Sequence, residues 1–367
     1  MSTDTVVGRL RALRDELGDT HVLALVRIGF GLLLGHEAWL ATETFRRVGF
    51  FGNYFHQPML PEALVTSIWL YRLILGAQWA TAAAIIVGRH ARPALLVAAS
   101  LLLYTMLCDR LSFHHYKHTM LTFSTLLAFT PCDRHLVLGR RGDDEAAPMW
   151  AANVIKAQVS VMYLASGGSK LFDPEWRGGL QMRGMVRSFA RLVEHRGMPD
   201  DWVLTLQHPV VSSWLAKGAI ATELSLAIFL WWPKTRRMAL WVGLLFHLTI
   251  SLMTPVLLFT AEMLIIYLIF ATPDRQARVL RYDPARSSLA PVIKVFDWLG
   301  RYRLELSSNT ILTVVDRDGT ELEGIQAAAC VFATIPILFV AWPAVALLAR
   351  LTRPRADDPV AIPTPES

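Results

Sequence analysis

The chain has 367 residues, of which 53% are hydrophobic and 18% are charged. Soluble domains carry about 25% charged residues, so this composition excludes an ordinary soluble globule, and its hydrophobicity excludes a disordered chain. Three cysteines cannot form a disulfide framework. The net charge of +6 comes from arginines spread over short polar segments, which argues against nucleic acid as a partner and indicates a multi-pass membrane protein.

Eight apolar segments are predicted to cross the bilayer, because a span needs about 20 mostly apolar residues. They are residues 21–41, 64–87, 94–107, 118–130, 151–168, 210–232, 238–254 and 257–271. The predicted fold class is therefore all-α, a polytopic membrane helix bundle. It carries an amphipathic helix in an outer loop and a small C-terminal extramembrane region.

The distribution of basic residues predicts the orientation of this bundle. With the N-terminus in the cytoplasm, fifteen Lys and Arg residues fall in inner segments and ten in outer segments. We therefore expect a cytoplasmic segment at 1–20, a transmembrane domain at 21–272, and a location in a bacterial cell membrane. In this orientation the loop 171–209 lies outside.

The outer loop contains LQMRGMVRSFARLV, in which apolar residues recur at helical spacing with arginines on the opposite side. Two interpretations are open: an amphipathic helix on the membrane surface, or a helix packed in an extramembrane lid.

The polar segment 273–324 is expected outside the membrane, and within it ILTVVDRDGTELEG predicts a strand, a turn and a second strand. Residues 325–351 follow as a hydrophobic region. The uncharged stretch 325–349 is long enough for a ninth span, but Pro336 and Pro343 favour two shorter helices, so both interpretations are open. The tail 352–367 is predicted to be disordered.

Ionisable residues inside spans are costly and are functional candidates by default. The predicted spans contain Arg27, Glu37, Glu223, His247 and Glu262. We expect Arg27, Glu223, His247 and Glu262 to face the interior of the bundle. For any one of these residues alone, a structural role such as an interhelical hydrogen bond is favoured over a functional one.

The sequence HHYKH places His114 and His118 on one helical face, a spacing that metal sites also use. No carboxylate-rich motif accompanies them, so no metal site is predicted. In the segment VSVMYLASGGSKLFDPEWRGG, Lys170 follows a run of small residues near the outer boundary of the fifth span. A lysine in an apolar helix-lined pocket can act as a general base, whereas an exposed one only anchors the helix at the interface.

The chain resembles the HTTM (horizontally transferred transmembrane) family, whose best-known member is the vitamin K-dependent gamma-carboxylase. Four patches carry the resemblance, in order and in agreement with the spans, over about residues 20–275. They are LALVRIGFGLLLGHEAWL, KHTMLTFSTLLAFTPCDRHLVL, QVSVMYLASGGSKLFDPEWRGG, and the pair TELSLAIFLWWPKTRRMAL with GLLFHLTISLMTPVLLFTAEMLIIYL.

The resemblance implies a quinol-linked active site. Lys170 matches the base that deprotonates vitamin K hydroquinone, and His118 matches the residue that stabilises the developing oxyanion. A lipid quinol of the vitamin K or menaquinone type would be the cofactor, and an acidic peptide or protein would be the substrate. A substrate or quinone pocket is predicted from Tyr163, Trp176, His114, Arg27, Glu223 and His247, with Tyr163 as its floor and Trp176 as its cap.

The sequence departs from the carboxylase after the last span, where the large region that binds propeptide and glutamate has no counterpart, and its extracellular cysteine pair is absent. These departures argue against gamma-carboxylation of a protein. The C-terminal part resembles the tail of a DCC-type thiol oxidoreductase domain without its cysteine-bearing front half. The alternatives to an enzyme are a transport module, or a non-catalytic membrane partner or immunity-type protein on the same scaffold.

Overall fold

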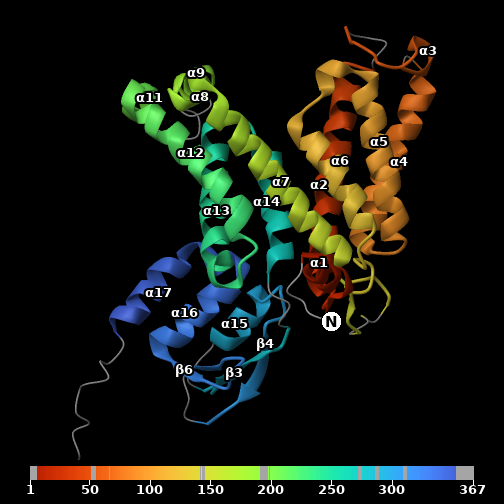
Figure 1. Cartoon of the computed structure of the whole chain (residues 1–367). Coiled ribbons are helices and arrows are strands. Elements are labelled where there is room, and N and C mark those ends of the chain that lie inside the picture. Colours follow the sequence, from red (N-terminus) through yellow and green to blue (C-terminus); the bar gives the residue numbers. More distant parts are fainter. Residues whose placement is uncertain are drawn as a thin grey trace, which may run out of the picture. The chain divides into compact units, whose positions relative to one another are not determined.

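The computed structural model describes residues 6–50, 55–65, 67–140, 142, 145–190, 197, 199–271, 275–285, 289–308 and 312–352. The chain divides into two compact units, Met1–Pro273 (unit 1) and Asp274–Ser367 (unit 2). Figure 1 labels the elements of both units, with unit 1 running from red to green-blue and unit 2 in blue. The tail predicted to be disordered, 352–367, lies outside the described residues except for Thr352.

The described residues of unit 1 form helices and one two-stranded ladder, in which β1 (Leu17–Gly18) pairs with β2 (Ala147–Pro148). Its first helices are α1 (Val6–Asp15), α2 (His21–Arg47), α3 (Glu62–Val65), α4 (Ile68–Val87), α5 (Ala91–Cys108) and α6 (His115–Ala128). The later ones are α7 (Trp150–Phe172), α8 (Pro174–Arg177), α9 (Leu180–Ser188), α11 (Asp200–Gln207), α12 (Pro209–Phe229), α13 (Pro233–Met253) and α14 (Leu257–Tyr267). Short 3-10 turns follow α5 and α14, at Arg110–Ser112 and Leu268–Phe270.

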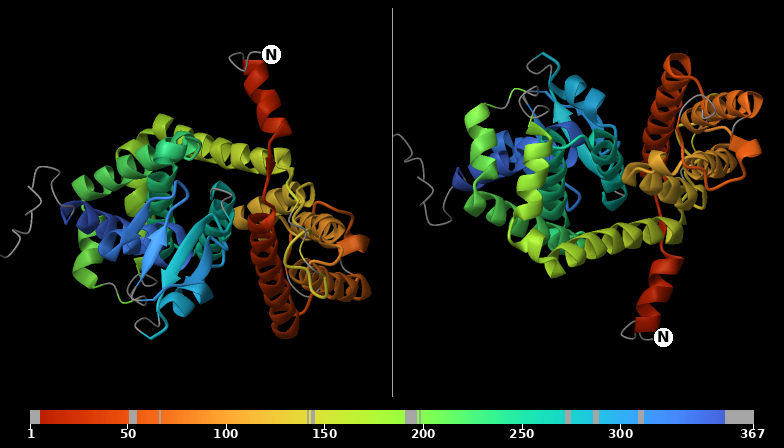
Figure 2. Two further views of the ribbon diagram at one scale, coloured as in Figure 1. Left: turned by 90° about the horizontal axis from the view of Figure 1, so that it is seen from below. Right: turned by 90° about the horizontal axis from the view of Figure 1, so that it is seen from above.

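The long helices of unit 1 pack in two groups. In the first, α2 packs on α4, α4 on α5, and α5 on α6; in the second, α7 packs on α12 and α12 on α13. Both views in Figure 2 show the first group in red to orange beside the yellow-green α7. Helix α14 joins the groups, because it contacts α13 as well as α2 and α6.

Three helices, α2, α4 and α5, are long and apolar enough to cross a membrane, and the bent pair of helices at 324–351 would make a fourth if it formed one span. They support a membrane protein of mostly helical structure. The total of about eight spans stays a prediction, since length and composition do not decide it for the other helices.

The outer loop folds into the short helices α8, α9 and α11. Val186 of α9 is buried and packs with Val203 and Leu206 of α11. The start of α9 lies close to α12 because residue 179 is a glycine. A Cβ at this position would overlap the Ser213 backbone nitrogen, and the φ of +78° is one that other residues rarely adopt. Helix α9 is therefore packed against α11 within this loop, which is called the lid below. Its position on the membrane surface or outside the membrane stays a prediction, and residues 191–196 of the predicted helix lie outside the described residues.

Unit 2 contains a four-stranded sheet, so the all-α class does not extend to this part of the chain. The strands are β3 (Arg278–Tyr282), β4 (Tyr302–Leu306), β5 (Thr313–Val315) and β6 (Glu321–Glu323), in the order β4-β3-β5-β6. β3 and β4 are parallel and flank α15 (Leu289–Phe296), whereas β5 and β6 form the antiparallel hairpin that the sequence predicted.

The hydrophobic C-terminal stretch forms two helices, α16 (Gly324–Thr334) and α17 (Trp342–Leu351), with a 3-10 segment at Pro336–Ala341 between them. The pair is bent by 116°. The α16 side chains of Ala327 and Val331 belong to the core that also holds Leu280 and Val314 of the sheet. Proline at the start of each later segment ends the preceding helix, as the two prolines suggested.

Candidate functional site

Lys170 and Glu223 form an ion pair between α7 and α12. The Lys170 Nζ lies 2.5 Å from Glu223 Oε1 and 2.8 Å from the Ser166 hydroxyl, which itself donates to the same carboxylate oxygen at 3.1 Å. The exposed side-chain fractions are 18% for Lys170 and 7% for Glu223. The ammonium group therefore lies among protein groups and not in bulk solvent.

The close packing of α7 on α12 depends on Gly167. A Cβ at this position would lie 3.0 Å from the Leu224 side chain and 3.2 Å from the Glu223 Cβ. Small residues allow helix backbones to approach in this way. Gly167 thus brings Glu223 within reach of Lys170, which lies one turn further along α7.

Trp176 covers Lys170 from the loop that follows α7. The Lys170 Nζ lies 5.1 Å from the centroid of the indole ring, a distance suited to a cation–π contact. Asp173 caps α8 by accepting hydrogen bonds from the backbone nitrogens of Glu175 and Trp176, which positions the ring. The predicted role of Trp176 as the cap of a quinone pocket stays a prediction.

A second group of polar side chains joins Tyr163 of α7 to His247 of α13 and Tyr267 of α14. The Tyr163 hydroxyl is hydrogen-bonded to His247 Nε2 at 2.7 Å and to the Tyr267 hydroxyl, and all three side chains are buried. Gly243 makes room for the Tyr267 ring, since a Cβ there would overlap its hydroxyl oxygen. Tyr163 precedes Lys170 by seven residues on α7, about 10 Å along the helix axis.

Two buried polar atoms of this region have no hydrogen-bond partner in the part of the chain that the structure describes. They are Glu223 Oε2 and His247 Nδ1. A buried polar atom without a partner costs about 1–3 kcal/mol and is commonly found where a ligand, a water molecule or a proton is exchanged.

A separate set of carboxylates lies between α2, α6 and α14. Glu262 is fully buried and accepts a hydrogen bond of 2.6 Å from the Thr119 hydroxyl, while Glu37 lies 3.7 Å from the Lys117 Nζ. Each carboxylate keeps one oxygen without a hydrogen-bond partner among the described residues. The sequence indicated both acids but neither partner, because Thr119 and Lys117 lie on another helix.

Arg27 binds the backbone of the loop that follows α6. Its guanidinium donates to the backbone carbonyl oxygens of Cys132, His135 and Leu136 at 3.0, 3.2 and 2.7 Å, and the side chain is fully buried. Arg27 therefore stabilises this loop. None of these three hydrogen bonds involves Lys170, Ser166, Glu223 or Trp176.

His114 and His118 are exposed at the start of α6. The His114 ring stacks on Tyr116, and the His118 ring lies 6.2 Å from that of Phe113. Within the described residues, no hydrogen bond or ion pair joins His118 to Lys170. The predicted partnership of these two residues stays a prediction.

No group of three or more His, Cys, Asp or Glu side chains suited to a metal occurs in the described residues. The described thiols are also poor ligands and nucleophiles. Burial raises the pKa of the Cys132 thiol to about 11 and raises that of Cys330 in α16. Both thiols are therefore protonated at neutral pH.

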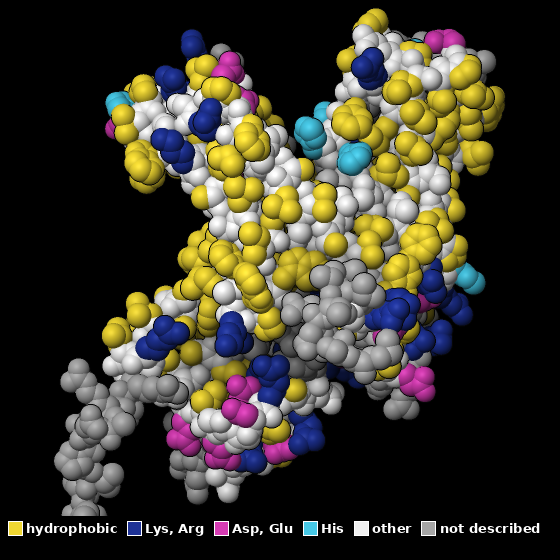
Figure 3. All heavy atoms as spheres, viewed as in Figure 1, with side chains coloured by type: hydrophobic (Ala, Val, Ile, Leu, Met, Phe, Trp, Pro, Cys, Tyr) yellow, Lys and Arg dark blue, Asp and Glu magenta, His cyan; other side chains and the backbone are white. Residues whose placement is uncertain are grey.

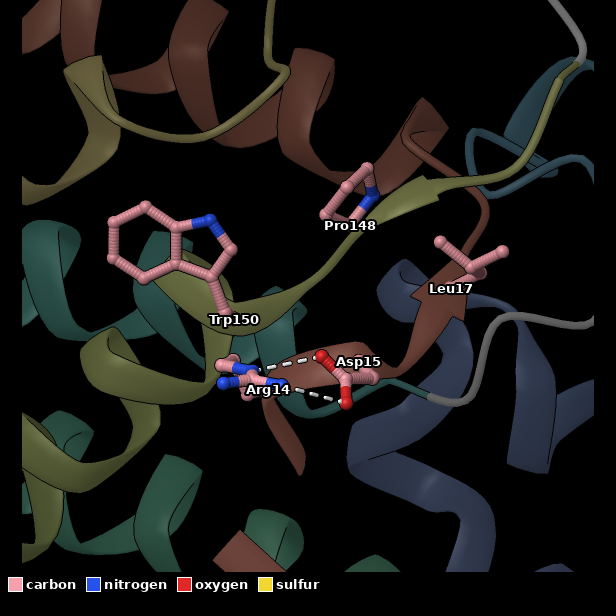
Figure 4. A pocket seen from close by; sticks show the side chains of 5 residues that line it. All are labelled: Arg14, Asp15, Leu17, Pro148 and Trp150. Atoms are coloured by element: carbon pink, nitrogen blue, oxygen red, sulfur yellow. Dashed lines mark hydrogen bonds and ion pairs between the residues drawn. The ribbon is translucent and has the colours of Figure 1, made fainter. Parts of the chain in front are cut away.

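Figure 4 shows a cavity of about 570 Å³ elsewhere in unit 1. It is lined by Arg14, Asp15, Leu17, Pro148 and Trp150, where α1, the β1–β2 ladder and α7 meet. Arg14 and Asp15 form an exposed ion pair there, with side-chain exposures of 67% and 61%. It contains none of the residues predicted for the quinone pocket.

The model of the HTTM domain matches residues 16–275 of this chain. The match includes α2 through α14, and with them Lys170, Glu223 and the Tyr163 group. The chain belongs to the HTTM-domain family. This confirms the resemblance seen in the sequence, and it identifies unit 1 as the membrane module of gamma-carboxylase-like proteins. No solved structure matches this HTTM protein.

The site contains two residues that the sequence analysis missed, Ser166 and Tyr267. Ser166 could have been predicted as a neighbour of Lys170, since it lies four residues before Lys170 and so on the same helical face. The contact of Tyr267 with Tyr163 could not have been predicted, because Tyr267 ends an apolar helix and reaches Tyr163 only through the packing of α13 and α14.

Proposed function

We propose that this HTTM protein is a multi-pass membrane enzyme in which Lys170 acts as a base toward a lipid quinol. The observation that carries the proposal is the Lys170–Glu223 pair. It joins a basic nitrogen to a buried carboxylate under an aromatic ring, next to a buried hydroxyl and imidazole group. Catalytic bases are typically found in such partly dry sites.

The proposed step is a proton transfer. In the ion pair Lys170 is an ammonium, so it first passes a proton to Glu223, which releases that proton to water. A quinol hydroxyl then gives its proton to the neutral Lys170 amine, the quinol becomes a quinolate, and the new ammonium pairs again with ionised Glu223. Trp176 offers an aromatic face against which a quinol ring can stack. Glu223 Oε2, which has no partner among the described residues, is available to accept the proton next.

His118 is proposed to donate a hydrogen bond to the quinolate oxygen. Replacing it with alanine is expected to lower the rate of quinol oxidation by about 10²–10³, the usual cost of losing an oxyanion donor. His115→Ala is the matched control, because His115 is an exposed neighbour on the same helix. Stopped-flow measurement of quinol oxidation distinguishes the two variants, and equal rates for both would remove His118 from the mechanism.

The quinolate would then give two electrons to dioxygen as the oxidant, and this oxidation would drive the modification of an acidic peptide or protein outside the membrane. Arg177 and Arg187 of the lid are exposed and contribute positive charge on the same side of unit 1 as the Lys170 end of α7. In Figure 3 basic side chains gather over this end of the molecule. Such a charged surface raises the local concentration of acidic substrates.

The proposed orientation places the N-terminus in the cytoplasm of a bacterial cell and the lid outside. An Arg187→Cys variant in a Cys330→Ser background is therefore expected to react with a membrane-impermeant maleimide added to intact cells, since Arg187 is exposed, Cys108 and Cys132 are buried, and the partly exposed Cys330 has been removed. Labelling only in inside-out vesicles would reverse the orientation.

The activity itself is tested with purified protein in detergent, supplied with menaquinol or vitamin K hydroquinone, with and without bicarbonate. Oxidation of the quinol above the rate with Lys170→Arg supports an enzyme. Equal rates would contradict the enzyme and favour a non-catalytic membrane partner on this scaffold.

Transport is the second candidate, and the Glu37 and Glu262 set supports it. Buried carboxylates with unpartnered oxygens are typical of proton paths between helices. In proteoliposomes, proton uptake that is lost in Glu262→Gln but retained in Lys170→Arg would favour transport over quinol chemistry.

A further inference from the structure

Unit 2 has two faces of opposite character. The first is the outer face of its sheet, where side chains alternate with those of the core. Arg281 of β3 lies there between two carboxylates, 3.5 Å from Glu305 and 2.5 Å from Glu321, and Arg303 lies 2.9 Å from Glu305. Because exposed ion pairs are costly to desolvate, this face of the sheet is expected to contact water.

The opposite face of the sheet is covered by α15 and α16. One core cluster joins Ala290 of α15 and Ala327 of α16 to Leu280 and Val314 of the strands. Both helices therefore lie in one layer on the same side of the sheet. Helix α17 continues this layer, since it contacts α16 and buries Ala349.

The outer side of this helix layer is apolar. On α17, the exposed residues Ala344, Leu347, Leu348 and Leu351 recur at i, i+3, i+4 and i+7 and so form one stripe. The three leucines are 58%, 51% and 73% exposed, and Ala349 faces the other way.

The preceding 3-10 segment and α15 extend the apolar surface. Ile337 and Val340 are exposed in the former, and Val292, Val295 and Trp298 are exposed in or just after the latter. In Figure 3 hydrophobic side chains cover the α17 part of unit 2, while acidic and basic ones gather on its strands.

We infer that unit 2 binds the lipid bilayer surface through this helix layer. The bilayer is the binding partner that the covalent connection of unit 2 to unit 1 favours. Unit 1 is a membrane module, its last turn ends at Phe270, and β3 begins at Arg278. The seven residues between them reach about 25 Å at most, so unit 2 is held within that distance of the membrane.

The composition of the layer fits a lipid interface. Trp298 and Trp342 are side chains of the kind found at the headgroup level, and Arg350 of α17 supplies positive charge beside the apolar stripe. Helices α16 and α17 have 11 and 10 residues, so each is about 15 Å long and neither crosses a core of about 30 Å. Their place is in the plane of the interface.

The test uses the full chain in lipid nanodiscs, with an environment-sensitive fluorophore attached to cysteine. Leu348→Cys places the probe on the apolar stripe, and Glu321→Cys, its matched control, places it on the polar face of the sheet. Lipids brominated along their acyl chains are then compared with ordinary lipids.

The probe at residue 348 is expected to lose at least about half of its emission in brominated lipid, and the probe at residue 321 to lose none. Val340→Cys gives a second position in the layer if Leu348→Cys does not fold. Two outcomes overturn the inference. A water-like, unquenched probe at residue 348 means that the face is solvated, and a blue-shifted but unquenched probe means that unit 1 or a second copy of the chain covers it.

Discussion

Lys170→Arg is expected to lower quinol oxidation by roughly 10²–10⁴-fold, the contribution of a positioned base. A guanidinium keeps its proton at any accessible pH, so it cannot act as that base. It does keep the charge that pairs with Glu223, which lies 2.5 Å from the native ammonium. Loss of activity should therefore occur without loss of folding.

Lys156→Arg is the matched control for this change. Lys156 lies on the same helix and donates to Asn153 at 3.0 Å, away from the Lys170 group. Its replacement should leave the rate within about twofold of the parent, as expected for a substitution outside the reacting groups. An active Lys170→Arg protein would exclude Lys170 as the base and leave it as an interfacial anchor.

Arg27→Met is expected to lower the free energy of unfolding by at least about 3 kcal/mol, because buried carbonyl oxygens left without a donor cost about 1–3 kcal/mol each. The side chain is fully buried and bonds to three such oxygens between residues 132 and 136. Denaturant titration in detergent, followed by tryptophan fluorescence, measures the loss.

Two further variants define the Arg27 effect. Arg46→Met, at the exposed end of the same helix, should change the free energy of unfolding by no more than about 0.5 kcal/mol. Gly88→Ala should destabilise the protein, because its Cβ would lie 2.6 Å from Arg27 Nη1 at a φ of +87°. A stable Arg27→Met protein would show that the loop after α6 does not depend on this residue.

The parts of the site that share one helix could be predicted from the sequence. Tyr163 and Lys170 are fixed relative to each other by helical geometry, and Trp176 follows after a short turn. The partner of Lys170 could not be predicted, since Glu223 lies 53 residues away and reaches it only because Gly167 admits α12. Arg27 shows the same limit: its burial was expected, but its carbonyl partners in a distant loop were not.

The long helices of unit 1 could be predicted from apolar segments of the sequence. In unit 2, the sequence predicted the hairpin but not the other two strands of the sheet. The hairpin of β5 and β6 is a local structure with a turn signal between its strands. β3 and β4 pair in parallel across α15, so their pairing depends on contacts distant in sequence, and arginines interrupt their apolar pattern. The exposed apolar stripe of α17 could not be recognised in a segment that is apolar on all sides, since only the burial of one side distinguishes the faces.

The central claim is that a lipid quinol binds beside Lys170, and photo-crosslinking tests it most directly. The protein would be illuminated with an azido-quinone, digested, and the modified peptides identified by mass spectrometry, with and without excess menaquinol. We predict modification in the segment from Tyr163 to Trp176, suppressed by menaquinol. Modification confined to other segments, or unaffected by menaquinol, would contradict a quinol site at Lys170.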